Sequence, residues 1–276
     1  MSPSPENPLP ESIENRNESK EHVRPVDFGF ATERGGLHER LGRENEDSLF
    51  ISGPGSEYFV AAIADGMGGH GRAKEASEKA ITALADKLGQ GEQGLSKQDV
   101  WNAVELADQS VRSLRPDSTL RIMEKKLPGS TLVVLAEIDQ ETGRGWLIAN
   151  IGDSRAYLVR AGKVQQLTID QTYGEEKRAQ GEVASKNFAD LLTHCLGGDQ
   201  AEFNRDWVDF YSVRPVPGDA IILASDGLEH RGAVSRGDMA QAVSDSAVSA
   251  GQAAENLTLT AAGPNSDDVS VIVVKF

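Results

Sequence analysis

Residues 58–69 read YFVAAIADGMGG, an apolar run that ends at Asp65 and passes directly into glycines. A continuous apolar run of this length is typical of a strand buried on both faces. The carboxylate at its end is costly to desolvate unless something neutralises it. The glycines allow a sharp backbone turn after the acid and offer a carbonyl as an additional ligand. The stretch therefore predicts a buried strand with a functional acid at its end.

Acidic residues stand at the ends of other apolar runs as well. Asp226 follows AIILAS and precedes Gly227, so that ASDGL echoes IADGM. The others are Asp153 after WLIANIG, Asp267 and Asp268 before VSVIVV, and Glu46 and Asp47 before SLFI. Any single Asp could simply start a turn or cap a helix, but that reading is weak for the set. Converging carboxylates require cations. Because no Cys or His stands at metal-ligand spacing, all ligands would be oxygens, which suit Mg²⁺ or Mn²⁺.

The composition narrows the function further. The 276-residue chain carries 43 Asp and Glu against 28 Lys and Arg, a net charge of −15. This excess of negative charge opposes binding to nucleic acid or to anionic membranes and suits binding to cations. The first twenty residues lack the apolar segment of a secretory signal, and no apolar run approaches a membrane span. Cys195 is the only cysteine, so we expect no internal disulfide and a cytoplasmic location.

The order of the elements indicates one domain after a tail. Residues 1–24 are rich in Pro, Glu, Ser and Asn and predict a disordered tail, followed by a single domain over residues 25–276. Strands are expected from Asp27 and at 48–52, 58–64, 131–138, 146–151, 155–160, 164–167, 207–213, 220–224 and 269–276. Helices are expected at 73–88, from Ser96 to about 114, and within 235–261. Adjacent strands with two pairs of helical segments indicate an α+β fold with helices outside stacked antiparallel sheets.

Gly66, Gly68 and Gly71 also match the dinucleotide-binding pattern G-x-G-x-x-G between a strand and a helix. Asp86 lies about twenty residues further on, as that pattern requires. However, Asp65 would place a negative charge beside the pyrophosphate, Asp86 lies within a predicted helix, and a second helix follows instead of a strand. These observations disfavour a nucleotide site.

Taken together and in order, these segments resemble the metal-dependent protein phosphatases of the type-2C (PPM) family, in its bacterial branch. The resemblance covers about residues 27–276. The matching segments are NEDS (45–48), ADGMGGH (64–70), GSTLVVL (129–135), IGDSRAYLVRAGKVQQLT (151–168), LTHCLGG (192–198), PGDAIILASDGL (217–228) and SDDVSVIVV (266–274). It implies a four-layer α-β-β-α fold, a central β-sandwich of two mostly antiparallel sheets flanked by helix pairs. Residues 25–276 would be its catalytic domain. Residues 169–190 are polar and are expected to be irregular, and the flap at about 171–190 would be short with little hydrophobic surface.

The resemblance also assigns roles to the acids. Asp65 would bridge two Mn²⁺ or Mg²⁺ ions, with the Gly66 carbonyl on the second and Asp226 and Asp267 on the first. The acids in supporting places are Glu46 and Asp47, which would hold metal-bound waters, and Asp153, which would share a weaker third site with Asp226.

The function implied is a serine/threonine protein phosphatase. Two cations lower the pKa of a bridging water, which attacks phosphorus directly without a phosphoenzyme. Asp65, Asp226, Asp267 and Arg43 would form the catalytic set. The substrates would be phosphorylated Ser/Thr proteins, the targets of a cognate kinase, and the enzyme would be a monomer. Cys195 lacks the C-x₅-R context of cysteine phosphatases and is expected in the core. The alternative is a catalytically impaired module that binds a phosphoprotein or signalling partner.

The sequence departs from the family around the phosphate. Bacterial members carry Arg-x-x-Asn-Glu-Asp, whereas Arg43 lies one residue too close to the Asn, so that Arg40 or His38 could serve instead. Asp268 stands in an Asn position and could ligate or only accept hydrogen bonds. Elsewhere, Met67 occupies the place of the general-acid His of animal members, His70 is expected to be structural, and His194 replaces an Arg.

Overall fold

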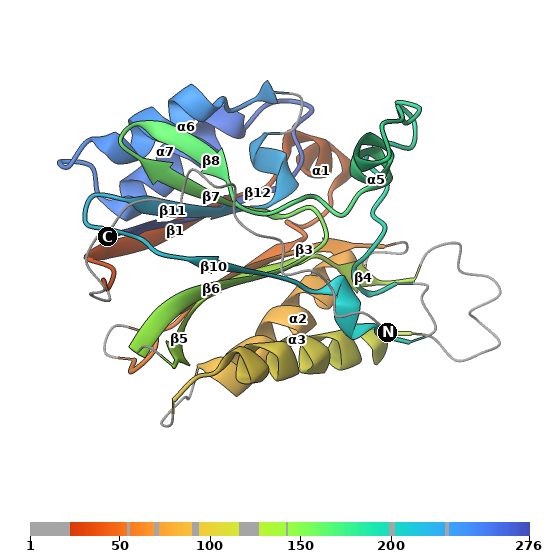
Figure 1. Ribbon diagram of the computed structural model, residues 1–276. Coiled ribbons are helices and arrows are strands. Elements are labelled where there is room, and N and C mark those ends of the chain that lie inside the picture. The colour runs from red at the N-terminus through yellow and green to blue at the C-terminus, as the bar shows by residue number, and fades with distance from the viewer. Residues whose placement is uncertain are drawn as a thin grey trace.

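The computed structural model describes residues 23–53, 56–68, 72–89, 94–115, 127–141, 143–198, 202–229 and 232–276. Two antiparallel sheets stack face to face, and a pair of helices covers the outer face of each (Figure 1). This arrangement confirms the predicted α+β sandwich. The expected tail lies outside the described residues apart from Val23 and Arg24, and so do His70 and Gly71. Within the described residues, no helix is long and apolar enough to cross a bilayer.

All strand pairs in the two sheets are antiparallel within the described residues. The five-stranded sheet has the order β1 (Asp27–Glu33), β12 (Val269–Lys275), β11 (Ala220–Ala224), β7 (Arg155–Arg160) and β8 (Lys163–Gln166). The second sheet has the order β10 (Asp209–Val213), β6 (Gly143–Ile151), β5 (Leu132–Gln140), β3 (Val60–Met67), β4 (Gly129–Ser130) and β9 (Leu196–Gly197), with β2 (Asp47–Ile51) paired to β3.

The helices lie on the outside of the sandwich. α2 (Ala73–Leu88) and α3 (Lys97–Arg112) cover the β3–β5–β6 sheet, and α6 (Arg236–Ser244) and α7 (Ala250–Ala261) cover the other sheet (Figure 1). A capping box opens α3 at Ser96, where the sequence predicted the helix to start: the Ser96 side chain accepts from the Asp99 N–H, and the Asp99 side chain accepts from the Ser96 N–H. Among the described residues no strand lies between α2 and α3, so the βαβ unit of a dinucleotide site is not found at this point.

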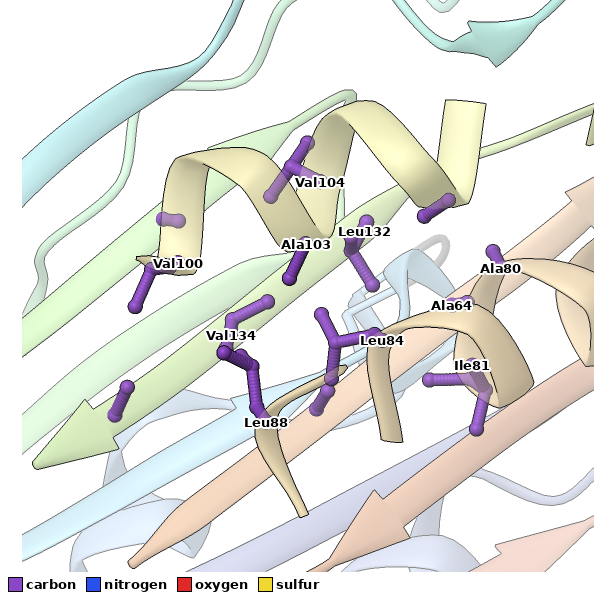
Figure 2. Close-up of a cluster of buried hydrophobic side chains, with 14 of the residues drawn as sticks. Ala64, Ala80, Ile81, Leu84, Leu88, Val100, Ala103, Val104, Leu132 and Val134 are labelled. Carbon is purple, nitrogen blue, oxygen red and sulfur yellow. The ribbon is translucent and has the colours of Figure 1, made fainter. Parts of the chain in front are cut away.

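Three apolar layers hold the sandwich together, and β3 contributes to two of them. Val60, Ala62 and Ala64 face α2 and α3, whereas Ala61 and Ile63 face the opposite sheet. This alternation confirms that the apolar run is a strand buried on both faces. Figure 2 shows how Leu84 and Leu88 of α2 and Val100, Ala103 and Val104 of α3 gather over Leu132 and Val134 of β5.

Some expectations were wrong. The segment predicted as an irregular flap contains α5 (Tyr173–Ala179), whose first turn is capped by Thr172, because the Thr172 Oγ1 accepts from the Glu175 N–H. The flap also exposes more apolar surface than predicted, since Val183 is 97 % exposed and Phe188 54 %. The helical residues expected within 235–261, by contrast, are confirmed as two helices, with Ser249 capping the second.

A short helix that the sequence did not predict, α1 (Gly36–Leu41), follows β1. It begins at the second of two consecutive glycines, Gly35 and Gly36, a pair that normally signals a turn. Both glycines pack tightly against the loop that precedes β12. A Cβ on Gly35 would overlap the Asp267 backbone, and one on Gly36 would overlap the Gly263 carbonyl. The glycines therefore let the chain come close to this loop where the helix starts.

Candidate metal centre

The acids predicted at strand ends lie at one end of the sandwich. β2 and β3 pair so that Asp47 lies opposite Asp65. The end of β11 lies between β7 and β12, with Ala224 opposite both Arg155 and Val271. The acids in the last residues of these strands or just outside them are therefore neighbours. They are Glu46, Asp47, Asp65, Asp153, Asp226 and Asp267.

Asp65 lies at the centre of this group. Its pKa is raised well above the ordinary value, first by burial and then by the negative charges of four other carboxylates. Those carboxylates are Asp47, Asp226, Asp153 and Asp267. Carboxylates from five separate segments of the chain thus lie close enough to Asp65 to act on its charge. At neutral pH such a group must take up protons or cations.

The backbone around Asp65 is fixed on both sides. The Asp65 N–H donates to the Thr131 Oγ1 at 3.0 Å, and the Asp65 carbonyl accepts from the Thr131 N–H at 2.9 Å and the Ser130 Oγ at 3.0 Å. Gly66 follows, and a Cβ there would overlap the Ala73 carbonyl at the start of α2. Only glycine fits this approach. The sharp turn predicted directly after the acid is wrong, because β3 continues through Gly66 to Met67 and pairs there with β4.

Asp47 has one satisfied and one unsatisfied carboxylate oxygen. It is 3 % exposed, and its Oδ2 accepts from the Ser225 Oγ at 2.8 Å. Its Oδ1 is buried without a hydrogen-bond partner among the described residues. Burial, together with the nearby charges of Asp268 and Asp226, raises the pKa of Asp47 to about 7. An unpartnered buried carboxylate oxygen is expensive, so this atom requires a ligand.

Asp153 and Glu46 flank the same point. Asp153 lies in the turn between β6 and β7, and burial and the charge of Asp226 raise its pKa to about 7. Burial also raises the pKa of Glu46, while His38 and Arg43 oppose that rise. Both carboxylates are thus held where the uncharged form is favoured, as expected of groups that need a positive partner.

Asp267 and Asp268, which precede β12, have different environments. Asp268 is 3 % exposed and accepts three hydrogen bonds, from the Gly35 N–H at 2.7 Å, the His38 Nδ1 at 2.8 Å and the Glu46 N–H at 2.6 Å. Asp267 is half-buried and accepts from the Asp268 N–H. Of the two roles considered for Asp268, these contacts favour the hydrogen-bond acceptor and leave Asp267 as the candidate ligand.

The three candidate phosphate-binding residues differ clearly in environment. His38 is 8 % exposed, and its Nδ1 is hydrogen-bonded to the Asp268 Oδ2. Arg40 donates to the Asn265 Oδ1 at 2.8 Å. Arg43 is exposed and close enough to Glu46 to lower its pKa, and within the described residues it forms no ion pair. Of these three, Arg43 is therefore the best placed to meet an anion at the site.

Some contacts at the site gave no signal in the sequence. The sequence named His38 only as an alternative phosphate-binding residue, whereas in the structure His38, Asp267 and Asp268 bring ligand-type atoms within 4.8 Å of one another. His38 lies on α1, a helix that was not predicted. Ser225, which holds Asp47, could have been found, because it directly precedes Asp226. His194 stacks on Trp207, and Cys195 is buried as expected.

The donor set fits hard divalent cations. All converging side chains are carboxylates, the ligands that Mg²⁺ and Mn²⁺ prefer. Within the described residues, no Lys or Arg side chain forms an ion pair with the carboxylate of Asp47 or Asp65. The unsatisfied Asp47 Oδ1 is consistent with a metal-linked partner.

Comparisons with known proteins agree with this geometry. Residues 34–260 match the family described as protein phosphatase 2C. The chain is 28 % identical to the serine/threonine phosphatase stp of Listeria innocua over 204 residues, which cover 72 % of this chain and 76 % of that protein.

Two solved structures share the fold. The PPM Ser-Thr phosphatase MsPP from Mycobacterium smegmatis matches with a TM-score of 0.73 and 27 % identity, covering 92 % of this chain and all of that one. The catalytic domain of the phosphatase PstP in complex with 2 manganese ions matches with a TM-score of 0.69 and 27 % identity, covering 90 % and 96 %. The family match over residues 34–260 agrees with the sandwich fold and with the acidic centre. This chain therefore belongs to the protein phosphatase 2C family, in its bacterial branch.

Proposed function

We propose that this phosphatase hydrolyses phosphoserine and phosphothreonine in proteins, using Mn²⁺ or Mg²⁺ held by its acidic centre. The observation that carries the proposal is the convergence of carboxylates on Asp65, together with the unsatisfied Oδ1 of the buried Asp47. Carboxylates arranged in this way would repel one another without a cation between them.

The proposed ligand set separates direct ligands from supporting acids. Asp65 would bridge two ions, the Gly66 carbonyl would complete one of them, and Asp226 and Asp267 would bind the other. The supporting acids are Glu46 and Asp47, which would hold the ions through water, and Asp153, which with Asp226 would hold a third ion. When bound, two such ions supply an activated water and positive charge for the phosphoryl group.

The other residues at the site would bind the substrate and hold the metal ligands in place. Arg43 would bind the phosphate of the substrate through charge-assisted hydrogen bonds and so orient phosphorus for direct attack by water. The Ser225 hydroxyl would keep the Asp47 carboxylate turned toward the ions, since it donates to the Oδ2. The backbone clamp of Thr131 would hold Asp65 in place while charge redistributes.

The partners proposed are phosphorylated Ser/Thr proteins that a cognate kinase modifies. The net charge of −15 supports a protein that binds neither nucleic acid nor membrane. We further propose a monomer that acts in the cytoplasm, with residues 25–276 as a single catalytic domain.

Phosphate release from a phosphothreonine peptide tests this proposal. The full-length protein should release phosphate with Mn²⁺, and a chelator should stop the reaction. The Asp226→Ala variant should lose activity by about a hundredfold or more, because a direct ligand is removed. Release that survives chelation would contradict the metal-dependent mechanism. Tight peptide binding without release would favour the non-catalytic phosphoprotein-binding module.

A further inference from the structure

The short helix α1 is docked on the loop that carries Asp267. The Gly36 N–H donates to the Ser266 Oγ at 3.1 Å, and the Leu37 N–H donates to the Ser266 carbonyl at 3.2 Å. The close approach of Gly35 to the Asp267 backbone adds to this docking. The helix therefore depends on the same loop that offers a candidate metal ligand.

Asp268 joins this helix to the segment just ahead of β2, which bears Glu46. One oxygen, Oδ1, accepts from the Gly35 N–H ahead of α1, while the other, Oδ2, accepts from both His38 in α1 and the Glu46 N–H ahead of β2. An ionised carboxylate only accepts, so the His38 Nδ1 donates in this pair. An Asn at this position would turn an NH₂ group toward one of these donors. The Asp is therefore required by the contacts that this chain makes.

The His38 ring and backbone extend the connection to the substrate side. Its Nε2 lies 3.9 Å from the Glu46 Oε2, so the ring stands between two carboxylates. Its carbonyl accepts from the Arg43 N–H at 2.9 Å. One buried residue thus contacts both Glu46 and the backbone of the candidate phosphate-binding arginine.

We propose that His38 and Asp268 are positioning residues that together fix Glu46 and Arg43 relative to the metal centre. This inference rests on the proposed function of Arg43 as the phosphate ligand. The chain displaces that arginine by one residue from the family spacing, and the α1 clamp supplies a different way of holding it. His38 and Asp268 need not touch the substrate to do so.

The first test measures the clamp without activity. Hydrogen exchange of residues 34–47 is compared in the metal-free wild type, His38→Phe and His38→Asn. Phe removes the donor, whereas Asn can keep an N–H donor near the place of Nδ1. We expect exchange to be about tenfold faster in His38→Phe and within about threefold of wild type in His38→Asn. Asp268→Asn, which barely changes volume, should resemble His38→Phe. Wild-type exchange rates in His38→Phe and Asp268→Asn would overturn the proposal.

The second test is a double-mutant cycle on KM for a phosphothreonine peptide, with Mn²⁺ at saturation. His38→Phe should raise KM by about tenfold and change kcat by less than about threefold. If His38 acts through Arg43, the double variant with Arg43→Ala should have a KM within about threefold of Arg43→Ala alone. If the two substitutions act independently, the factors by which each raises KM will multiply in the double variant, and that result would overturn the proposal. Lack of turnover in the wild type would instead refute the phosphatase proposal, while hydrogen exchange still decides whether the clamp exists.

Discussion

Asp47 and Asp65 lie directly opposite each other in the antiparallel pairing of β2 with β3. Directly opposed residues share a face of the sheet, with Cβ atoms about 4.5–5.5 Å apart, and like charges there are destabilising. The fold keeps both acids although each has a raised pKa in the metal-free protein. The pairing register itself therefore builds a site of concentrated negative charge that a cation would stabilise.

Removing the charge of Asp47 should stabilise the metal-free protein. We expect Asp47→Asn to raise the free energy of unfolding in chelator by about 1–2 kcal/mol at neutral pH, because repulsion and desolvation are relieved. The same variant should bind Mn²⁺ at least about tenfold more weakly. Chemical denaturation and calorimetry measure the two effects. Asp86→Asn, an exposed change on α2, should alter stability by less than about 0.5 kcal/mol. Lower metal-free stability in Asp47→Asn would contradict this prediction.

The metal-free protein should lose stability as the pH rises. Asp47 and Asp153 have folded-state pKa values of about 7, above the ordinary value of 3.8. The native state therefore holds more protons than the unfolded state between these values, so the free energy of unfolding falls with rising pH. Thermal unfolding in chelator should therefore show stability falling from about pH 4.5 to 7.5 in the wild type. The double variant Asp47→Asn/Asp153→Asn lacks both groups, so its stability should fall less over the same range. Saturating Mn²⁺ should stabilise the wild type more at the upper end of the range. Equal slopes in wild type and variant would argue against it.

Arg43 should act on substrate binding. Arg43→Ala should raise KM for a phosphothreonine peptide by about tenfold or more, with Mn²⁺ affinity unchanged, because a charge-assisted contact to phosphate is lost. Arg40→Ala is the matched control, since Arg40 is occupied by Asn265 and should change KM by less than about threefold. Steady-state kinetics compare the two. A larger effect in Arg40→Ala would reverse the assignment.

Ser225 should link the metal centre to the strands around it. Its hydroxyl donates to the Asp47 Oδ2 and accepts from the Ser270 N–H at 3.0 Å. Ser225→Ala should cost about 1–3 kcal/mol of stability, because a buried N–H loses its partner, and should weaken Mn²⁺ binding. Ser244→Ala, which removes an exposed hydrogen bond to the Ala240 carbonyl, is the control with little effect on either. Unchanged Mn²⁺ affinity in Ser225→Ala would separate the hydroxyl from the metal site.

Much of the fold and the acidic half of the site could be predicted from the sequence, because both follow from local patterns. The run before Asp65 alternates between two buried faces, and its apolar character reports that burial directly. Asp226 and Asp267 lie at strand ends, where β-pairing brings neighbouring ends together. No single strand indicates how the strands are arranged in sheets, but the order of the motifs along the chain resembles a family whose fold is a β-sandwich.

The clamp around His38 could not be predicted, because it depends on contacts distant in sequence. His38 and Asp268 are 230 positions apart, and the helix that carries His38 begins at the second glycine of a pair that normally signals a turn. The sequence favoured Arg43 and kept Arg40 as an alternative, and their neighbours in the structure, Glu46 and Asn265, distinguish them. In the flap, the predicted irregular structure was wrong because a local cap at Thr172 is enough to start a short helix.

The most direct test of the central claim is calorimetric titration of Mn²⁺ into the chelator-stripped full-length protein. A carboxylate centre built around Asp65 predicts about two tightly bound ions per chain. The variant Asp65→Asn should lose tight binding, because the bridging charge is removed. No tight Mn²⁺ binding by the wild type, or equal binding by Asp65→Asn, would contradict the metal centre.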